Sequence, residues 1–255
     1  MGIDNKKPDI TKECVETLLD TRFIKVYDLQ YAEGKHYYDA TRRGKDDLVA
    51  VKSDEEFKKM MPDAVTCAVI LVDGQQEKND KAEGSGGAGS AGAFEPKLLL
   101  SREFRYPTGR FLLSPPAGLI DPEDKEGYEK GLPIDDALIS TAKREISEET
   151  GLTVGDEDRI FVINQCLFST PGMTDESNAL VCAVIDVRNQ AVEANMIESI
   201  LSTEGAVGSE VFDGFVLVNE AEAREIIKKG RDSYDNFFSV YTWCVLMYFV
   251  SGMWK

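Results

Sequence analysis

The sequence predicts an α/β fold joined to a small N-terminal antiparallel β domain. Residues 64–72 form a continuous apolar run, which is typical of a strand buried on both faces of a sheet. Residues 135–150 repeat apolar side chains at helical spacing, whereas residues 22–42 alternate as a β-hairpin does. With 255 residues and 42% hydrophobic content, the chain can bury a core of ordinary size.

The N-terminal β domain is predicted to cover residues 1–60. Its first 18 residues are polar and then weakly helical. Residues 22–31 alternate as a strand, residues 33–35 turn the chain, and residues 36–42 return. Because strands of this length cannot bury a core alone, we expect them to pack on the main domain or on a second copy of the chain.

The main domain is predicted to cover residues 61–255, after a short acidic helix at residues 54–60. Residues 75–95 are rich in glycine and serine and too poor in apolar side chains to fold, so we expect a disordered loop there. Further strands are expected at residues 98–105, 110–113, 159–168, 179–187 and 212–218, and helices covering the sheet at residues 221–229 and 236–253.

The helix over residues 135–150 is expected to begin at Asp135 or Asp136 and to end at Gly151, which can take the left-handed conformation that closes a helix. One face of this helix would pack against the protein core, and the other would carry charged side chains. The apolar face consists of Ile139, Ala142 and Ile146.

The charged face of this helix places Arg144 and three glutamates within six residues. At about 100° per residue, Glu145, Glu148 and Glu149 fall on one arc. Like charges at this spacing repel by a few tenths of a kcal/mol per pair, and Arg144 is expected to orient only one of them. A hard divalent cation with oxygen ligands would remove the repulsion, so the cluster favours a metal site over a solvated acidic face.

Residues 144–152, Arg-Glu-Ile-Ser-Glu-Glu-Thr-Gly-Leu, resemble the second half of the Nudix box. The first half departs from the pattern. Its glycine is best matched by Gly118 in Pro-Ala-Gly-Leu-Ile-Asp, and its acid by Asp136, or by Asp124 when counted forward from Gly118. This match implies an insertion of 12 residues, which we interpret as a lengthened surface loop around residues 122–127.

The Pro-Ala-Gly-Leu-Ile-Asp stretch resembles the ADP-ribose and ADP-sugar pyrophosphatase branch of that family. The resemblance implies a Nudix α/β/α sandwich with a mixed sheet. It also implies that Glu145, Glu148, Glu149 and the Ala117 carbonyl hold two to three Mg2+ or Mn2+ ions. Arg144 and Glu148 would be catalytic residues, because Arg144 fixes the metal-binding carboxylates.

Substrate contacts are also implied by the resemblance. Arg105 lies on the strand that carries an arginine towards the phosphates, which a guanidinium binds with two parallel hydrogen bonds. The alternative for Arg105 is a surface salt bridge. Phe23 and Tyr38 match aromatic residues that stack on adenine where the N-terminal strands are exchanged in a homodimer. The alternative is that Phe23 and Tyr38 have no role in binding, since aromatic residues are common in strands. Glu176 ends a Pro-Gly-x-x-x-Glu loop that lies beside the site in the family.

The resemblance also implies that a loop glutamate just ahead of a strand serves as the base or as an extra metal ligand. Glu210 precedes the strand expected at residues 212–218, so we favour it over Glu204 and Glu176. An ordinary exposed glutamate is the alternative reading.

Composition excludes several classes of partner. The formal net charge of -17 argues against a nucleic-acid or anionic-membrane surface, since both need clustered lysine and arginine. No apolar run reaches the 18 or so residues of a membrane span. The five cysteines have no Cys-x-x-Cys spacing, so we expect reduced thiols, no zinc site and a cytoplasmic protein.

The predicted activity is metal-dependent hydrolysis of the diphosphate bond in a nucleoside diphosphate-linked sugar, with ADP-ribose giving AMP and ribose 5-phosphate as the first candidate. One alternative keeps the hydrolase chemistry and changes the nucleotide, to a UDP-sugar, a dinucleotide or a coenzyme A derivative. Another is a nucleotide sensor that binds without hydrolysis, although such a module has no need of three box glutamates.

Overall fold

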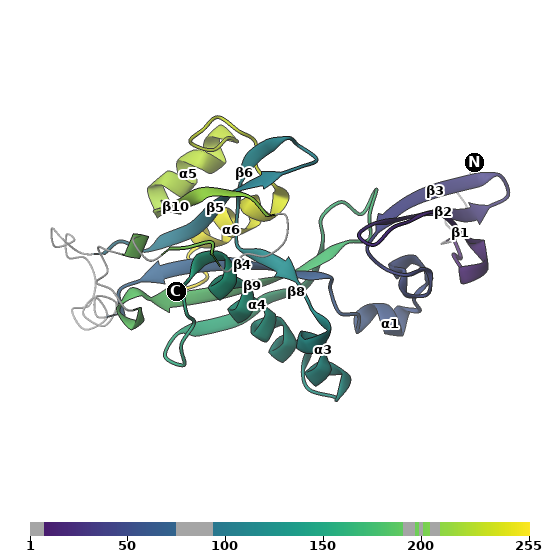
Figure 1. Ribbon diagram of the computed structural model, residues 1–255, viewed down its shortest axis with the longest axis horizontal. Coiled ribbons are helices and arrows are strands. Elements are labelled where there is room, and N and C mark those ends of the chain that lie inside the picture. The colour runs from purple at the N-terminus through teal and green to yellow at the C-terminus, as the bar shows by residue number, and fades with distance from the viewer. Residues whose placement is uncertain (1–7, 75–93, 191–196, 199–200, 205–209) are drawn as a thin grey trace. The chain divides into compact units, whose positions relative to one another are not determined.

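The computed structural model describes residues 8–74, 94–190, 197–198, 201–204 and 210–255 (Figure 1). The chain divides into two compact units. The small unit comprises residues 1–63 and 166–178, and the large unit comprises residues 64–165 and 179–255. Most of the expected loop at residues 75–95 lies outside the described residues, as do residues 205–209.

The small unit contains a three-stranded antiparallel sheet of β1 (Val15–Asp20), β2 (Lys25–Ala32) and β3 (Lys35–Thr41), in that order. Gly34 turns the β2–β3 hairpin with a φ of 66°, a conformation that glycine adopts without strain. The hairpin was expected. The weak helix expected at residues 10–18 was wrong, since among the described residues, which start at residue 8, only η1 (Lys12–Cys14) precedes β1.

Pairing with β2 explains why the residues of β1 form a strand. Val15 lies opposite Leu29 in the register, and both are buried with Tyr27 and Leu48 in a small core. Such long-range packing overrides a weak local helix preference. Three short helices complete this part of the unit, namely η2 (Lys45–Asp47), η3 (Val49–Val51) and α1 (Asp54–Lys58).

The large unit is built on a seven-stranded sheet in the order β10-β5-β4-β9-β8, with β6 paired to β5 and β7 paired to β4. Every residue of β4 is buried, as its apolar run predicted. The strands are β4 (Ala64–Val72), β5 (Lys97–Arg105), β6 (Arg110–Ser114), β7 (Ala117–Leu119), β8 (Arg159–Phe168), β9 (Ser177–Asp186) and β10 (Phe212–Val218).

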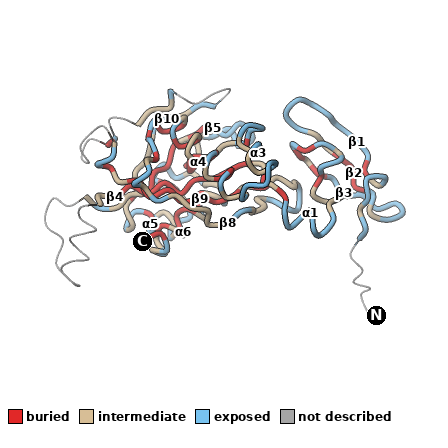
Figure 2. Tube along the Cα trace, turned by 90° about the horizontal axis from the view of Figure 1, so that it is seen from below, coloured by how far each residue is buried: buried red, intermediate tan, exposed pale blue. Residues whose placement is uncertain are grey.

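Helices cover both faces of this sheet (Figures 1 and 2). One face carries α4, which packs on β4 and β7, and the other carries α6, which packs on β4 and β6. The buried residues gather along the central strands between these layers (Figure 2). The helices are α3 (Pro122–Glu129), α4 (Ile134–Thr150), α5 (Glu220–Lys229) and α6 (Val240–Ser251), and η4 (Val187–Asn189) follows β9. The observed fold is therefore mixed α/β, as predicted.

Two local expectations need correction. Helix α4 begins at Ile134, with Pro133 as its N-cap residue, and not at Asp135 or Asp136; its end at Gly151, with a φ of 74°, is as predicted. The insertion read as a lengthened loop is the helix α3. Its first turn begins with Pro122 and is closed by a capping box between Asp121 and Asp124, two signals that start a helix.

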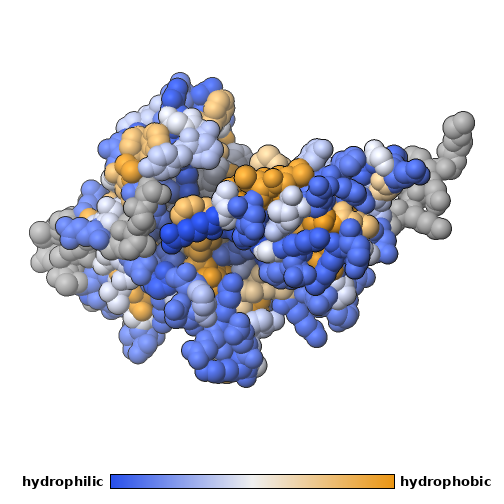
Figure 3. Space-filling model, turned by 45° about the vertical axis from the view of Figure 1, so that its right-hand side comes forward, coloured by the Kyte–Doolittle hydropathy of each residue, from blue (hydrophilic) through white to orange (hydrophobic). Residues whose placement is uncertain are grey.

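Hydrophilic side chains cover much of the face seen in Figure 3, with separate apolar areas between them. Among the described residues, no helix is long and apolar enough to cross a membrane. The five cysteines are all free thiols.

Candidate active site

The site is built where β7 meets α4. In the β4–β7 ladder, Gly118 lies opposite Val65, and α4 brings Glu145 against it. A Cβ atom on residue 118 would stand 1.9 Å from the Glu145 carboxyl carbon and 2.1 Å from each of its oxygens. Only a residue without a side chain permits this approach, so Gly118 is the glycine that the carboxylate requires.

Arg144 joins the carboxylates of α4 to the start of α3. Its Nη1 lies 2.7 Å from Glu145 Oε1 and 3.2 Å from Glu148 Oε2. The expectation that it orients only one glutamate was therefore wrong. Its Nη2 lies 2.9 Å from Asp124 Oδ2 and donates to the Leu119 carbonyl at 3.0 Å. Such charge-assisted contacts are the strong ones among hydrogen bonds, so they hold the guanidinium in one place.

These contacts separate the two candidates for the acid in the first half of the box. Asp124 is largely buried and faces Arg144, while Asp136 is exposed on α4. The carboxylate that accompanies the arginine is therefore that of Asp124. The helix α3 delivers it, which explains why spacing along the sequence left the choice open.

Glu145 and Glu149 are buried, with 7% and 4% of their surface exposed, so α4 does not divide into an apolar face and a solvated charged face. The Ala117 N–H donates to Glu149 Oε2 at 3.2 Å. Burial raises the pKa of Glu145 to about 7 against the opposing effect of Arg144. It raises the pKa of Glu149 to about 9, against the hydrogen bond from Ala117. Two desolvated carboxylates this close favour protons or cations.

Glu103 is a fourth carboxylate of the cluster, and the sequence reasoning missed it. Its side chain is buried on β5 and its Oε2 lies 2.5 Å from Arg105 Nη2. Burial raises its pKa, Arg105 lowers it, and its charge in turn raises the pKa of Glu149. The sequence pattern could have indicated Glu103, because side chains two residues apart on a strand, here 103 and 105, point to the same face of the sheet.

Glu210 also belongs to this cluster. It lies just before β10, whose Phe212 is opposite Glu103 in the β10–β5 ladder. Partial burial raises the pKa of Glu210, Arg105 lowers it, and Glu148 raises it further. Glu210 and the competing candidate Glu204 are both exposed, and the Glu204 N–H donates to the Ser202 hydroxyl. The large unit thus brings Glu210 and Arg105 together with the box glutamates.

The remaining predicted substrate residues belong to the small unit. Phe23 is 69% exposed and has the Arg22 guanidinium over its ring at 5.2 Å. Tyr38 is 58% exposed on β3, opposite Asp28. Glu176 is paired with Arg42 at 3.0 Å.

The donor set of the cluster suits a hard divalent cation, because every donor is a carboxylate oxygen. Across the described part of the chain, no three His, Cys, Asp or Glu side chains are already turned towards one point as metal ligands. Glu145 and Glu148 instead turn to Arg144, and Glu149 turns to the Ala117 N–H. A cation would take over part of these contacts and offset the burial and the mutual repulsion that together raise the pKa values of Glu145 and Glu149.

No family model matches the chain. It is 33% identical over 108 residues to a putative nudix hydrolase 2 of Caenorhabditis elegans, covering 42% of this chain and 41% of the relative. It is 35% identical over 94 residues to an uncharacterized Nudix hydrolase of Schizosaccharomyces pombe, covering 36% and 37%. Nudix hydrolase 14, chloroplastic, of Arabidopsis thaliana is 28% identical over 146 residues, covering 54% and 41%. The matched part spans about two fifths of these relatives. Their shared name supports the Nudix family for this chain.

Proposed function

We propose that this chain is a metal-dependent Nudix hydrolase that cleaves the diphosphate bond of a nucleoside diphosphate-linked sugar, with ADP-ribose as the first substrate to consider. The observation that carries the proposal is the cluster of buried carboxylates around β7. Glu145 and Glu149 are held at the backbone of residues 117 and 118, where their raised pKa values favour a bound cation. The three relatives named Nudix hydrolases support the hydrolase part of the proposal.

Glu145, Glu148 and Glu149, with the Ala117 carbonyl, would hold two to three Mg2+ or Mn2+ ions. Such ions neutralise charge that develops on phosphate oxygens and lower the pKa of a bound water. Arg144 would keep the metal-binding carboxylates in place without binding the metal itself. Its guanidinium is in turn fixed by Asp124 and by the Leu119 carbonyl.

Arg105 would bind the substrate phosphates, since its guanidinium lies beside the carboxylate cluster and is oriented by Glu103. Glu210 would accept the proton of the attacking water or orient that water. Its raised pKa suits a general base, because a base works best when its pKa approaches the ambient pH.

In this proposal the small unit binds the nucleobase of the substrate and forms the contact between two copies of the chain. Phe23 and Tyr38 present exposed aromatic rings that can stack on a nucleobase, and in this proposal a homodimer forms through the N-terminal strands. Leu18, Leu19 and Ile24 of the same unit are exposed as well, and exposed apolar side chains of this kind are available for an interface. The free cysteines suit a reducing compartment such as the cytoplasm.

A substrate panel tests the proposal. ADP-ribose, UDP-glucose, a diadenosine polyphosphate and a coenzyme A derivative are incubated with the full chain in Mg2+, Mn2+ or EDTA, and the products are separated by chromatography. Formation of AMP and ribose 5-phosphate from ADP-ribose, abolished by EDTA, is the expected result. Turnover of another nucleotide would change the substrate and keep the chemistry. Binding without turnover in either metal would instead identify a nucleotide sensor.

A further inference from the structure

A cavity of about 290 Å3 lies within the small unit, and nothing in the proposed hydrolysis uses it. Its lining comes from β2 and β3, from residues 49–57, and from the end of the β8–β9 hairpin. Most of the lining is apolar, and the polar groups are few. The volume is at the lower limit of known small-molecule sites, roughly 300–1,000 Å3, which suits a ligand with a single ring.

Two acidic residues, Asp39 and Asp175, are among those that line this cavity. Asp39 is 6% exposed, and its Oδ1 accepts a hydrogen bond from the Asp175 N–H at 3.1 Å. The Asp175 side chain is 10% exposed, and its Oδ2 accepts from the Val49 N–H at 3.0 Å. Asp175 Oδ1 is buried with no hydrogen-bond partner in the described part of the chain. A buried carboxylate oxygen without a donor is costly, so it favours a ligand that supplies one.

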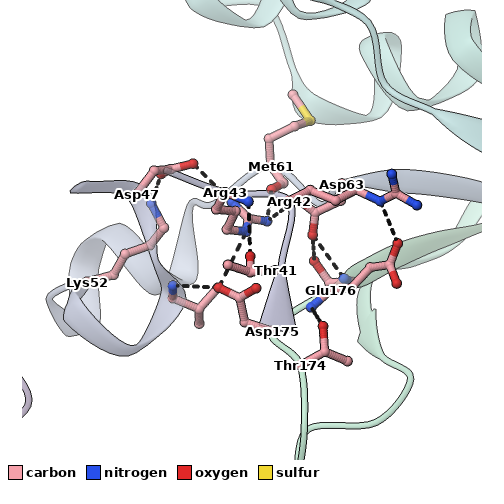
Figure 4. A network of polar contacts seen from close by, with 12 residues as sticks. Thr41, Arg42, Arg43, Asp47, Lys52, Met61, Asp63, Thr174, Asp175 and Glu176 are labelled. Carbon is pink, nitrogen blue, oxygen red and sulfur yellow. Dashed lines mark hydrogen bonds and ion pairs between the residues drawn. The ribbon is translucent and has the colours of Figure 1, made fainter. Parts of the chain in front are cut away.

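The neighbouring cations do not balance the charges of Asp39 and Asp175. Figure 4 shows Asp175 beside Arg43, Asp47, Lys52 and Asp63. Arg43 directs Nη2 to Asp63 at 2.9 Å and Nη1 to Asp47 at 3.2 Å, and only its Nε approaches Asp175, at 3.8 Å. Lys52 is paired with Asp47. Four carboxylates, with Asp39 included, thus share two cations. Burial and the Asp175 charge raise the pKa of Asp39 to about 6, as expected where negative charge is in excess.

The apolar side of the cavity is aromatic. Phe57 and Phe168 stack with their centroids 6.2 Å apart and their planes 10° from parallel, and both line the cavity. Leu29 and Met173 extend this wall. The negative faces of aromatic rings attract cations, and ring stacking favours a flat apolar body. The acidic residues and the aromatic rings of the cavity therefore favour the same kind of ligand, a cation with a flat apolar body.

We propose that this cavity binds a small organic cation, an ammonium or guanidinium group carried on a single aromatic or alkyl ring. The cationic N–H groups donate to Asp175 Oδ1 and to the Asp39 carboxylate. The ring lies against Phe57 and Phe168. All of these residues belong to the small unit, and none has a role in the proposed hydrolysis, so the inference stands or falls independently of it.

Isothermal titration of the full chain with benzylammonium, benzyl alcohol and benzoate tests this inference at mildly alkaline pH, where Asp39 is ionised. The three probes share a ring and differ in charge. Benzylammonium is expected to bind, and the neutral and anionic probes to bind about tenfold more weakly or not at all, because only the ammonium brings a positive charge to the two carboxylates. Equal binding of benzyl alcohol, or no binding of benzylammonium, would overturn the proposal.

Two variants locate the site. Asp175→Asn keeps an oxygen for the Val49 N–H and removes the charge, so it should weaken benzylammonium about tenfold or more. Asp46→Asn is the matched control, because this aspartate lies in the same unit with a side chain that is 86% exposed. Phe168→Leu serves as a second test if Asp175→Asn unfolds. It should weaken benzylammonium and remove the upfield shift that aromatic stacking gives the ligand's ring protons in NMR spectra. Unchanged affinity in the folded variants would show that the cation binds elsewhere.

Discussion

Gly118 and Glu145 are in such close contact that any side chain at residue 118 would overlap the Glu145 carboxylate. The strand β7 and the helix α4 can approach this closely only because the glycine leaves space for a carboxylate between them. A buried carboxylate is thereby held against the backbone of a strand.

Gly118→Ala should reduce turnover about 100-fold while the protein stays folded. The atoms in the way are the far end of a flexible side chain, so Glu145 can move at little cost in stability. A displacement of about 1 Å in a catalytic group can cost that much in rate. The turnover number and the melting temperature are measured together. Gly44→Ala, where a Cβ meets nothing within 4 Å, is the control. Full activity in Gly118→Ala would show that the position of the Glu145 carboxylate is unimportant.

Glu149→Gln should keep the fold and cut turnover by orders of magnitude. The glutamine oxygen can still accept from the Ala117 N–H, but it binds a divalent cation far more weakly. Mg2+ should therefore raise the melting temperature of the wild type more than that of the variant. Glu129→Gln, on the exposed end of α3, is the matched control. Near wild-type turnover in Glu149→Gln would remove this residue from the metal site.

Glu210→Gln should lower turnover while metal binding persists. The glutamate is exposed and lies near Arg105 and Glu148, so we expect it to act on the attacking water and not as a principal metal ligand. Turnover and Mg2+-dependent thermal shift are measured for both Glu210→Gln and Glu204→Gln. We expect a large loss of rate only for the first. The reverse pattern would assign the base to Glu204.

Asp124→Asn should lower activity, and Asp136→Asn should not. Asp124 is the buried partner of Arg144, whereas Asp136 is exposed. Loss of the charged partner should cost about 1–2 kcal/mol of unfolding free energy and loosen the guanidinium that holds Glu145 and Glu148. Urea unfolding and steady-state kinetics are compared for the pair. Equal behaviour of the two variants would contradict the assignment of Asp124 to the box.

Stability should depend on pH through Asp39. Its folded pKa of about 6 lies above the ordinary 3.8, so the folded state binds the proton more tightly. The free energy of unfolding therefore falls as pH rises through this window, by about 2–3 kcal/mol in total. Asp39→Asn keeps an acceptor for the Asp175 N–H and removes this titration. Relative to wild type, the variant should gain stability as pH rises, which urea unfolding across the window measures. If the free energy of unfolding of the two proteins changed with pH in the same way, the raised pKa of Asp39 would be refuted.

Local patterns in the sequence predicted a large part of the fold. The apolar run at Ala64–Val72 matches the bounds of β4, and Phe212–Val218 matches β10. Gly151 closes α4 where expected. These features are encoded within a few residues, through burial on both sides of a strand or through the freedom of glycine, so no knowledge of distant contacts is needed to see them.

The site could be predicted only in part. The string from Arg144 to Glu149 is local and was evident. Glu103 was missed, although the alternation of β5 places it on the face of Arg105, because its role depends on a cluster formed by distant segments. The helix α3 was missed because a composition suited to a loop also holds a capping box and a proline at the first helical position.

By itself, the sequence determined which residues can form the carboxylate cluster and which glycine can lie beside it. Tertiary structure alone decided that Glu145 and Glu149 are buried, that Arg144 joins two glutamates to Asp124, and that β1 is a strand. The physical reason is common to all three. The pKa of a carboxylate, the partner of a guanidinium and the fate of a weak helix depend on which distant segments pack against them, and the energy of that packing exceeds the local preferences.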